Sequence, residues 1–353
     1  MDFDVLDIIA AIWAASFVAC IAFALEILRS PRPEQSIAAW LLLFLFAAPL
    51  GAALYILLGR RKLRSRSQRK PPPRLTNLGH RDSLPISLFD ALIRSYGLSP
   101  AAEANKVTFC GTGDSAYAAV VDLIEEAERS LWVSNYILSD DPIGREIVRR
   151  LAARAEAGVQ VHLLVDYIGS PDARDETLVG PLEAAGGAVL RFMPVTFFPR
   201  SQHYSNLRNH RKMVLADQCR VWSGGMNLSE LYLGSPSQKG FFHDLSFVIE
   251  GSAAAVYARI FAGDWAFCAG EELPVLQADF RTARAVGTGV VQVVPSGPEI
   301  KGDAVYDVIL TMVHRAERRL WVVSPYFVPD VGLIRAFILA ARGGRAISHR
   351  FRV

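Results

Sequence analysis

A histidine, a lysine, an aspartate and an asparagine lie close together in the segment 209–227, NHRKMVLADQCRVWSGGMN. His210 precedes Lys212 by two residues, Asp217 follows, and a Gly-Gly turn and Asn227 end the segment. The runs MVLAD and CRVW alternate like neighbouring strands, with Asp217 at the turn between them. Since residues two apart on a strand face the same side, His210 and Lys212 can converge on one ligand if the strand has begun by residue 210.

These residue types fit chemistry at a phosphate group. A histidine nitrogen is largely neutral near its ordinary pKa of about 6.5, attacks phosphorus as a nucleophile and later leaves readily. A lysine neutralises the non-bridging oxygens, glycines allow close backbone approach, and an asparagine amide can donate to the same oxygens. The pattern indicates phosphoryl-group chemistry without a metal or other cofactor. The alternative, a surface His210 beside a solvated Lys212, leaves the fixed offsets of the other residues unexplained.

The pattern His-x-Lys-x4-Asp followed by Gly-Gly-x-Asn resembles the signature of the phospholipase D superfamily. Residues 32–61 are similar to the membrane hairpin of bacterial cardiolipin synthases, with Arg-Pro, Ala-Trp, Pro-x-Gly and Tyr-x-Leu-x-Gly elements. The stretch 242–251 resembles their Trp-x-Asp segment, although Phe242 stands in place of the tryptophan. The resemblance covers nearly the whole chain, to about residue 342.

The resemblance implies a role for each matching residue. It implies that His210 is the reactive histidine, that Lys212 and Asn227 bind phosphate beside the backbone of Gly225, and that Asp217 is a mainly structural member of the motif. It also implies that Asp244 orients a histidine ring through the other ring nitrogen, as a carboxylate paired with a nucleophilic histidine does. The alternative for Asp244 is a carboxylate at a turn or at the end of a strand. Four flanking residues are further candidates for the pocket: His203, Tyr204, Arg208 and Tyr232.

The elements that must position these residues follow an α/β pattern. Residues 117–130 and 143–158 are predicted as helices, and residues 131–138 and 159–167 as strands. Helices between short apolar runs predict a sheet covered on both faces. We therefore expect an α/β fold, with a phospholipase D-type sandwich unit as the resemblance implies.

A repeat indicates that a second unit begins near the C-terminus. AERSLWVSNYIL at 127–138 returns as AERRLWVVSPYFV at 316–328. The superfamily mechanism, as the resemblance implies, uses two facing motifs, with one histidine attacking phosphorus and the other protonating the departing alcohol. The step from Trp132 to His210 would place a second histidine beyond residue 353, so we expect the chain to be truncated before the second motif. The Arg-rich residues 343–353 are expected to be a shifted reading frame or an incidental tail in place of a strand, and His349 has no lysine at the required offset.

Two apolar runs, 8–28 and 37–58, are each long enough to cross a membrane. A cleaved signal peptide is the alternative for the first, but the residues before it are acidic instead of basic. Eight cations and no acid follow the second run within 60–74, which predicts a cytoplasmic location for everything after it and attraction to anionic lipid. We expect a multi-pass protein of the bacterial inner (plasma) membrane.

Charge and cysteine content exclude other classes. Of 38 basic and 35 acidic residues, removing the eight clustered cations leaves 30 against 35, so the body is not a basic surface for nucleic acid. The four cysteines form no CxxC pair, which predicts neither a zinc site nor a disulfide framework.

The resulting organisation has four parts: a membrane hairpin at 1–59, a basic linker at 60–105, a first phospholipase D-like unit at 106–285, and the incomplete start of a second at 286–353. The resemblance implies a phosphatidyltransferase that makes cardiolipin and glycerol from two molecules of phosphatidylglycerol through a phosphatidyl-histidine. The alternatives are a catalytically silent, membrane-anchored chain that binds anionic lipid, and a phospholipase D-type phosphodiesterase. In a further alternative, two chains form a homodimer and each donates one His210.

Overall fold

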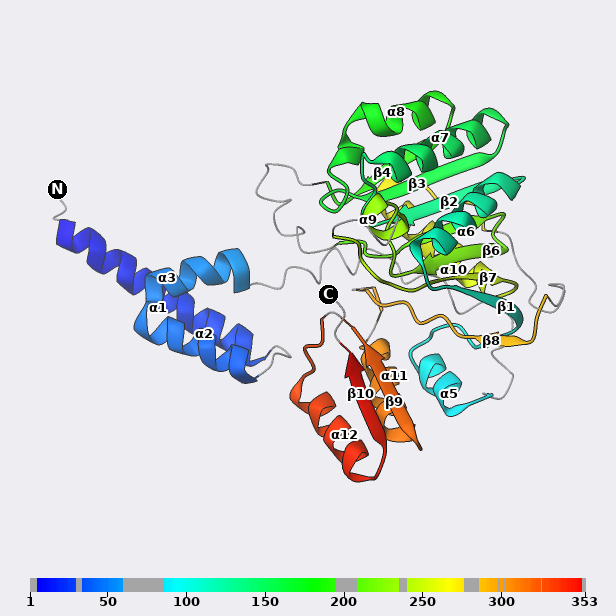
Figure 1. Ribbon diagram of the computed structural model, residues 1–353. Coiled ribbons are helices and arrows are strands. Elements are labelled where there is room, and N and C mark those ends of the chain that lie inside the picture. Colours follow the sequence, from blue (N-terminus) through cyan, green and yellow to red (C-terminus); the bar gives the residue numbers. More distant parts are fainter. Residues whose placement is uncertain are drawn as a thin grey trace. The chain divides into compact units, whose positions relative to one another are not determined.

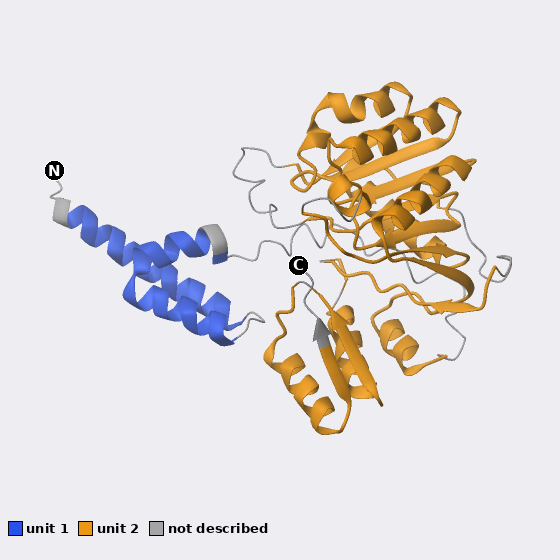
Figure 2. Ribbon diagram, in the orientation of Figure 1, with its two compact units in different colours: residues 1–66 blue, residues 67–353 orange. Residues whose placement is uncertain are grey.

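The structure is a computed structural model that falls into two compact units, residues 1–66 and 67–353 (Figure 2). It describes residues 5–29, 34–59, 86–194, 208–234, 240–275, 286–297, 299–300, 302–324 and 326–350.

The N-terminal unit contains α1 (Val5–Leu28), α2 (Glu34–Phe46), α3 (Ala48–Leu54) and a π-helical turn, Tyr55–Gly59 (Figure 1). Among the described residues, one helix, Asp7–Leu28, is long and apolar enough to cross a membrane. The expected single helix over 37–58 is corrected: it is interrupted at Ala47 (φ −145°, ψ 58°). The break lies two residues before Pro49, which has no backbone N–H to donate to the carbonyl one turn earlier and whose ring would clash with that carbonyl in a continuous helix.

An eight-stranded sheet forms the centre of the second unit, in the order β4-β3-β2-β5-β6-β7-β1-β8. β2, β3 and β4 are parallel neighbours, and every other pairing is antiparallel. The strands are β1 (Ala102–Cys110), β2 (Ser130–Asn135), β3 (Gln160–Asp166), β4 (Ala188–Phe192), β5 (Met213–Ala216), β6 (Arg220–Gly224), β7 (Ser246–Glu250) and β8 (Gly289–Val291).

Helices cover both faces of this sheet, as the α/β pattern predicted (Figure 1). On one face, Leu131 and Val133 of β2 share a core with α6 (Gly113–Glu126), α7 (Pro142–Glu156), α8 (Glu176–Ala184) and α9 (Glu230–Leu233). On the other, Trp132 and Leu215 pack with α10 (Ala254–Ala269). The alternation along β2 and β5 therefore separates two cores.

The segment predicted as linker is partly folded. Residues 60–85 lie outside the described residues, but α5 (Leu88–Ser95) and the start of β1 fall within the expected linker 60–105, which is corrected there. Asp90 is buried and accepts hydrogen bonds from the Ala101 amide (3.0 Å) and the Gln292 side chain (2.9 Å). These contacts tie α5 to the main unit.

The repeat seen in the sequence is also a repeat of structure. The second copy contains α11 (Ala304–Arg315), β9 (Arg319–Val323), α12 (Val331–Arg342) and β10 (Ala346–Arg350). β9 and β10 pair in parallel, as β2 and β3 do. We expected no strand in the Arg-rich end, but Ala346–Arg350 form one. Backbone pairing with β9 tolerates polar side chains. β8 pairs with β1, so the predicted boundary at 286 also falls inside the first sheet.

Candidate active site

His210 and Lys212 lie where the chain enters β5, beside the end of β2. β5 begins only at Met213, so strand alternation does not bring the two side chains together. They share a neighbour instead: the imidazole of His210 stacks on the Tyr136 ring with centroids 3.8 Å apart, and Lys212 Nζ lies 5.7 Å from the same centroid. Lys212 Nζ also donates to the His210 carbonyl oxygen (2.9 Å). The predicted pair is therefore brought together by a tyrosine.

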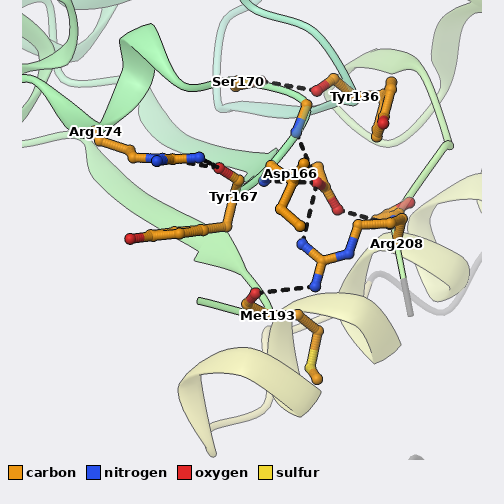
Figure 3. A network of polar contacts seen from close by, with 10 residues as sticks. Tyr136, Asp166, Tyr167, Ser170, Arg174, Met193 and Arg208 are labelled. Atoms are coloured by element: carbon orange, nitrogen blue, oxygen red, sulfur yellow. Dashed lines mark hydrogen bonds and ion pairs between the residues drawn. The ribbon is translucent and has the colours of Figure 1, made fainter. Parts of the chain in front are cut away.

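Asp166, at the end of β3, anchors the chain just before the histidine (Figure 3). Its carboxylate is fully buried and accepts the backbone N–H of Asn209 at 3.0 Å. The same carboxylate accepts the amides of Ile168 and Gly169 (both 2.9 Å) and pairs with Arg208 at 3.4 Å. The motif was predicted, but this carboxylate was not.

Arg211 holds the motif from the opposite face of the sheet. Its guanidinium donates to Asp264 of α10 (2.5 Å) and to Glu299 (2.7 Å), two residues that are themselves buried. Burial acts to lower the pKa of Arg211, but the two carboxylates outweigh it and raise the pKa above its ordinary value.

The charges around the motif favour a neutral histidine. Burial lowers the pKa of His210, and the cations of Lys212 and Arg208 lower it further against the opposing charge of Asp166. Burial also lowers the pKa of Lys212, which Asp244 partly opposes. A neutral imidazole next to a cation is the arrangement that a nucleophile at a phosphate requires.

The end of β6 brings the expected phosphate-binding residues to the same edge. Asn227 is buried, its Oδ1 accepts the Ile137 amide at 3.1 Å, and its side chain also hydrogen-bonds the Tyr232 hydroxyl. At Gly225, a Cβ would lie 2.2 Å from an Asp244 carboxylate oxygen, so a larger residue would require the Asp244 side chain to move. Within the described residues, no hydrogen bond joins Asp244 to a histidine ring; its charge acts on Lys212 instead, and its Oδ1 accepts the Leu245 amide.

Asp217 lies at the other end of β5, away from His210. Its carboxylate accepts the amides of Glu128 (3.0 Å), Arg129 (2.7 Å) and Ser130 (2.9 Å), the residues that lead into β2. Burial acts to raise the pKa of Asp217, but these donors outweigh it and lower the pKa below its ordinary value. The structure therefore separates Asp217 from the other motif residues and gives it a structural role.

Of the four flanking candidates for the pocket, the structure describes two. Arg208 pairs with Asp166, and the Tyr232 ring stacks on Phe242 at 4.9 Å near Asn227. His203 and Tyr204 lie outside the described residues. The part of the chain that the structure describes holds no group of three or more metal-ligating side chains.

A cavity of about 470 Å³ lies against residues 208–213, at the start of β5. Polar groups of 208–212 and Ser223 meet apolar walls from β4, α10 and residues 293–295. Its apolar lining comprises Phe192, Met213, Ile260, Phe267, Val293, Val294 and Pro295. A hollow with this mixed lining suits an amphipathic molecule.

Comparisons with known proteins agree with the motif. The family described as "Cardiolipin synthase, PLD-like domain" matches residues 120–265. A cardiolipin synthase of Geobacillus thermodenitrificans (strain NG80-2) is 30% identical over 343 residues, which cover 93% of this chain and 67% of that protein. The chain belongs to the cardiolipin synthases of the phospholipase D superfamily.

A second cardiolipin synthase and one solved structure are also similar to this chain. Cardiolipin synthase 2 of Bacillus anthracis is 33% identical over 235 residues, 66% of this chain and 45% of that protein. The chain thus spans between about half and two thirds of these relatives. The phosphatidylserine synthase of Haemophilus influenzae Rd KW20 shares the fold, with a TM-score of 0.51 at 14% identity over 75% of this chain and 66% of that one.

Proposed function

We propose that His210 is the nucleophile of a phosphatidyltransferase that makes cardiolipin and glycerol from two molecules of phosphatidylglycerol. The observation that carries the proposal is the exposed His210 stacked on Tyr136 beside Lys212, with Asn227 and Gly225 at the same edge. Burial and the nearby cations lower the pKa of His210, which favours the neutral imidazole. Membership of the cardiolipin synthase family supports the choice of substrate.

The reaction proceeds in two displacements. A nitrogen of His210 forms a bond to phosphorus of the first phosphatidylglycerol, and the bond to the glycerol oxygen breaks. A second histidine motif, as the family resemblance implies, protonates that oxygen. The hydroxyl of a second phosphatidylglycerol then attacks phosphorus of the phosphatidyl-histidine and gives its proton to the second histidine, which the first step left neutral, and the bond from phosphorus to the His210 nitrogen breaks. Lys212 offsets the charge on the non-bridging oxygens in both steps, and Asn227 Nδ2 exchanges its bond to Tyr232 for one to these oxygens.

The N-terminal unit serves as the membrane anchor in this proposal. α1 forms one crossing, and α2 with α3 returns, giving a multi-pass protein with the body in the bacterial cytoplasm. An aromatic cluster supports the hairpin, because Tyr55 packs against Phe23 of α1 (4.7 Å) and Trp40 of α2 (5.2 Å). The cations within 60–74 would attract anionic head groups.

The decisive experiment uses the full chain with vesicles of phosphatidylglycerol and follows cardiolipin and glycerol by mass spectrometry. We expect His210→Ala to lower the rate by roughly 10³-fold or more, as removal of a nucleophile does. The exposed His314 provides the matched control, and His314→Ala should retain the rate.

The other outcomes separate the alternatives. Phosphatidic acid in place of cardiolipin would identify a phosphodiesterase. Vesicle binding without turnover would identify a silent lipid-binding chain. A rate that rises with the square of protein concentration would identify two chains that each donate His210.

A further inference from the structure

We infer that Tyr136 is a positioning residue that fixes the ring plane of His210 and holds Lys212 beside the same aromatic ring. The inference rests on the proposed role of His210. An imidazole attacks along its own plane, through the lone pair of a ring nitrogen, so the orientation of that plane decides whether the attack is in line. A flat aromatic stack fixes the plane and leaves both ring nitrogens open at the edge.

The geometry of the contact is that of a stack. The two rings are inclined by 17° with centroids 3.8 Å apart, so they lie face to face. Among the described residues, no hydrogen bond reaches a ring nitrogen of His210. The hydrogen bond from the Lys212 side chain goes to the backbone carbonyl of His210 instead. The tyrosine ring is thus the group that sets the imidazole plane.

Tyr136 is itself held in place. Ser170 Oγ donates to the Tyr136 carbonyl oxygen (2.8 Å) and accepts the Leu138 amide (2.9 Å), which fixes the backbone on the C-terminal side of the tyrosine. Gly169 makes room for the ring, since a Cβ at Gly169 would lie 2.3 Å from the Tyr136 carbonyl oxygen and 2.7 Å from its Cε2.

One buried carboxylate joins the two halves of this arrangement (Figure 3). Asp166 Oδ1 accepts the amide of Gly169 (2.9 Å), and Asp166 Oδ2 accepts the amide of Asn209 (3.0 Å). The first bond shapes the turn against Tyr136, and the second fixes the backbone just before His210. The ring plane and the backbone of the histidine are therefore set from a common anchor.

The same ring also serves Lys212. Lys212 Nζ lies 5.7 Å from the Tyr136 centroid, within the range of a cation–π contact. The tyrosine ring thus contacts both the nucleophile and its neighbouring cation, without occupying the hydrogen-bonding capacity of either ring nitrogen of His210. The sequence repeat also carries a tyrosine after its strand: Tyr326 follows Trp321 by five residues, where Tyr136 follows Trp132 by four.

Three variants of the full chain in detergent test the inference. Tyr136→Phe keeps the ring, Tyr136→Leu keeps only the apolar bulk, and Tyr167→Leu removes a nearby aromatic ring that stacks on Arg174 (4.2 Å). The first readout is the titration of His210 by NMR with ¹³C-labelled histidine, assigned with His210→Ala. The second is the pH profile of kcat and KM for transfer from phosphatidylglycerol.

We expect Tyr136→Leu to let water reach the ring face, which moves the pKa of His210 upward toward its ordinary value of about 6.5. The acidic limb of the kcat profile should move in the same direction. The loss of alignment should lower kcat by roughly 10- to 100-fold with little change in KM. Tyr136→Phe and Tyr167→Leu should stay within about threefold of the wild type, because neither removes the stack.

A wild-type titration and kcat in Tyr136→Leu would overturn the inference, as would a Tyr136→Phe variant as impaired as Tyr136→Leu. If Tyr136→Leu does not fold, Gly169→Ala replaces it, because the added methyl displaces the tyrosine without changing its chemistry. The titration is independent of turnover. A wild-type protein that makes no cardiolipin would therefore contradict the proposed function. The NMR titration would still show whether Tyr136 stacks on His210.

Discussion

The two repeats of this chain begin with nearly the same residues but bury them differently. Trp132 of β2 is 2% exposed, whereas Trp321 of β9 is 68% exposed. Both strands start their parallel ladder in the same way, with the Gln160 amide donating to the Arg129 carbonyl and the Ala346 amide donating to the Arg318 carbonyl, each at 3.0 Å. The local backbone is therefore shared, and the surroundings are not.

The difference lies in what covers the second face of each strand pair. α10 covers β2, and Phe261 of α10 stacks on Trp132 with centroids 5.4 Å apart. Trp321 instead meets the guanidinium of Arg319 on its own strand at 4.9 Å. The motif on β5 also depends on α10, because Asp264 of that helix binds Arg211. A strand sequence alone thus specifies the ladder, while the covering helix turns it into a core that can hold a site.

The largest expected effect comes from truncating the two tryptophans separately. Trp132→Ala should lower the free energy of unfolding by about 3–5 kcal/mol, because it removes a fully buried aromatic side chain and leaves a cavity. Trp321→Ala should change it by no more than about 0.5 kcal/mol, as exposed substitutions do. Denaturant unfolding of the full chain in detergent measures both. Equal losses of unfolding free energy would mean that Trp321 is covered in solution, and would contradict the difference in burial between the two repeats.

The same contrast explains how much could be predicted from the sequence. The α/β pattern, the repeat and the convergence of His210, Lys212 and Asn227 follow from short-range patterns and a motif of fixed spacing. Asp166, Tyr136 and Asp264 could not be found in that way, because they reach the motif from β3, the end of β2 and α10 through tertiary contacts. The expectation that no strand forms in 343–353 was wrong for a related reason: pairing with β9 decides the strand Ala346–Arg350, whereas its own composition does not.

Asp217 provides the next test, since it clamps the start of β2 in the first repeat. Asp217→Asn should lower the free energy of unfolding by about 1–3 kcal/mol, because the amide cannot accept three backbone N–H groups as a carboxylate does. The exposed Asp122→Asn is the matched control. The rate per folded molecule should stay near the wild type, and a selective loss of turnover would instead assign Asp217 to catalysis.

The pH dependence of this clamp has a defined sign. The pKa of Asp217 is lower in the folded chain than in the unfolded chain, where it is about 3.9. Its contribution is therefore complete above that pH and is lost as the pH falls through the folded value. Wild-type stability should drop over this acidic range more than that of Asp217→Asn, and parallel curves would show that the carboxylate is not clamped.

The smallest expected effect concerns the residue that lies opposite each tryptophan in the neighbouring parallel strand. His162 faces Trp132 and lies edge-on to Trp265 at 4.7 Å, whereas Ser348 faces Trp321. Burial lowers the pKa of His162, partly opposed by Glu271, so protonation favours the unfolded chain. The stability that this neutral histidine maintains is complete above about pH 6.5 and falls as the pH drops from there toward the folded pKa.

His162→Gln should flatten the pH dependence of the unfolding free energy over this range, and His314→Gln should not. If the wild type and His162→Gln follow the same curve, the histidine is solvated and α10 does not seal this face of the first repeat.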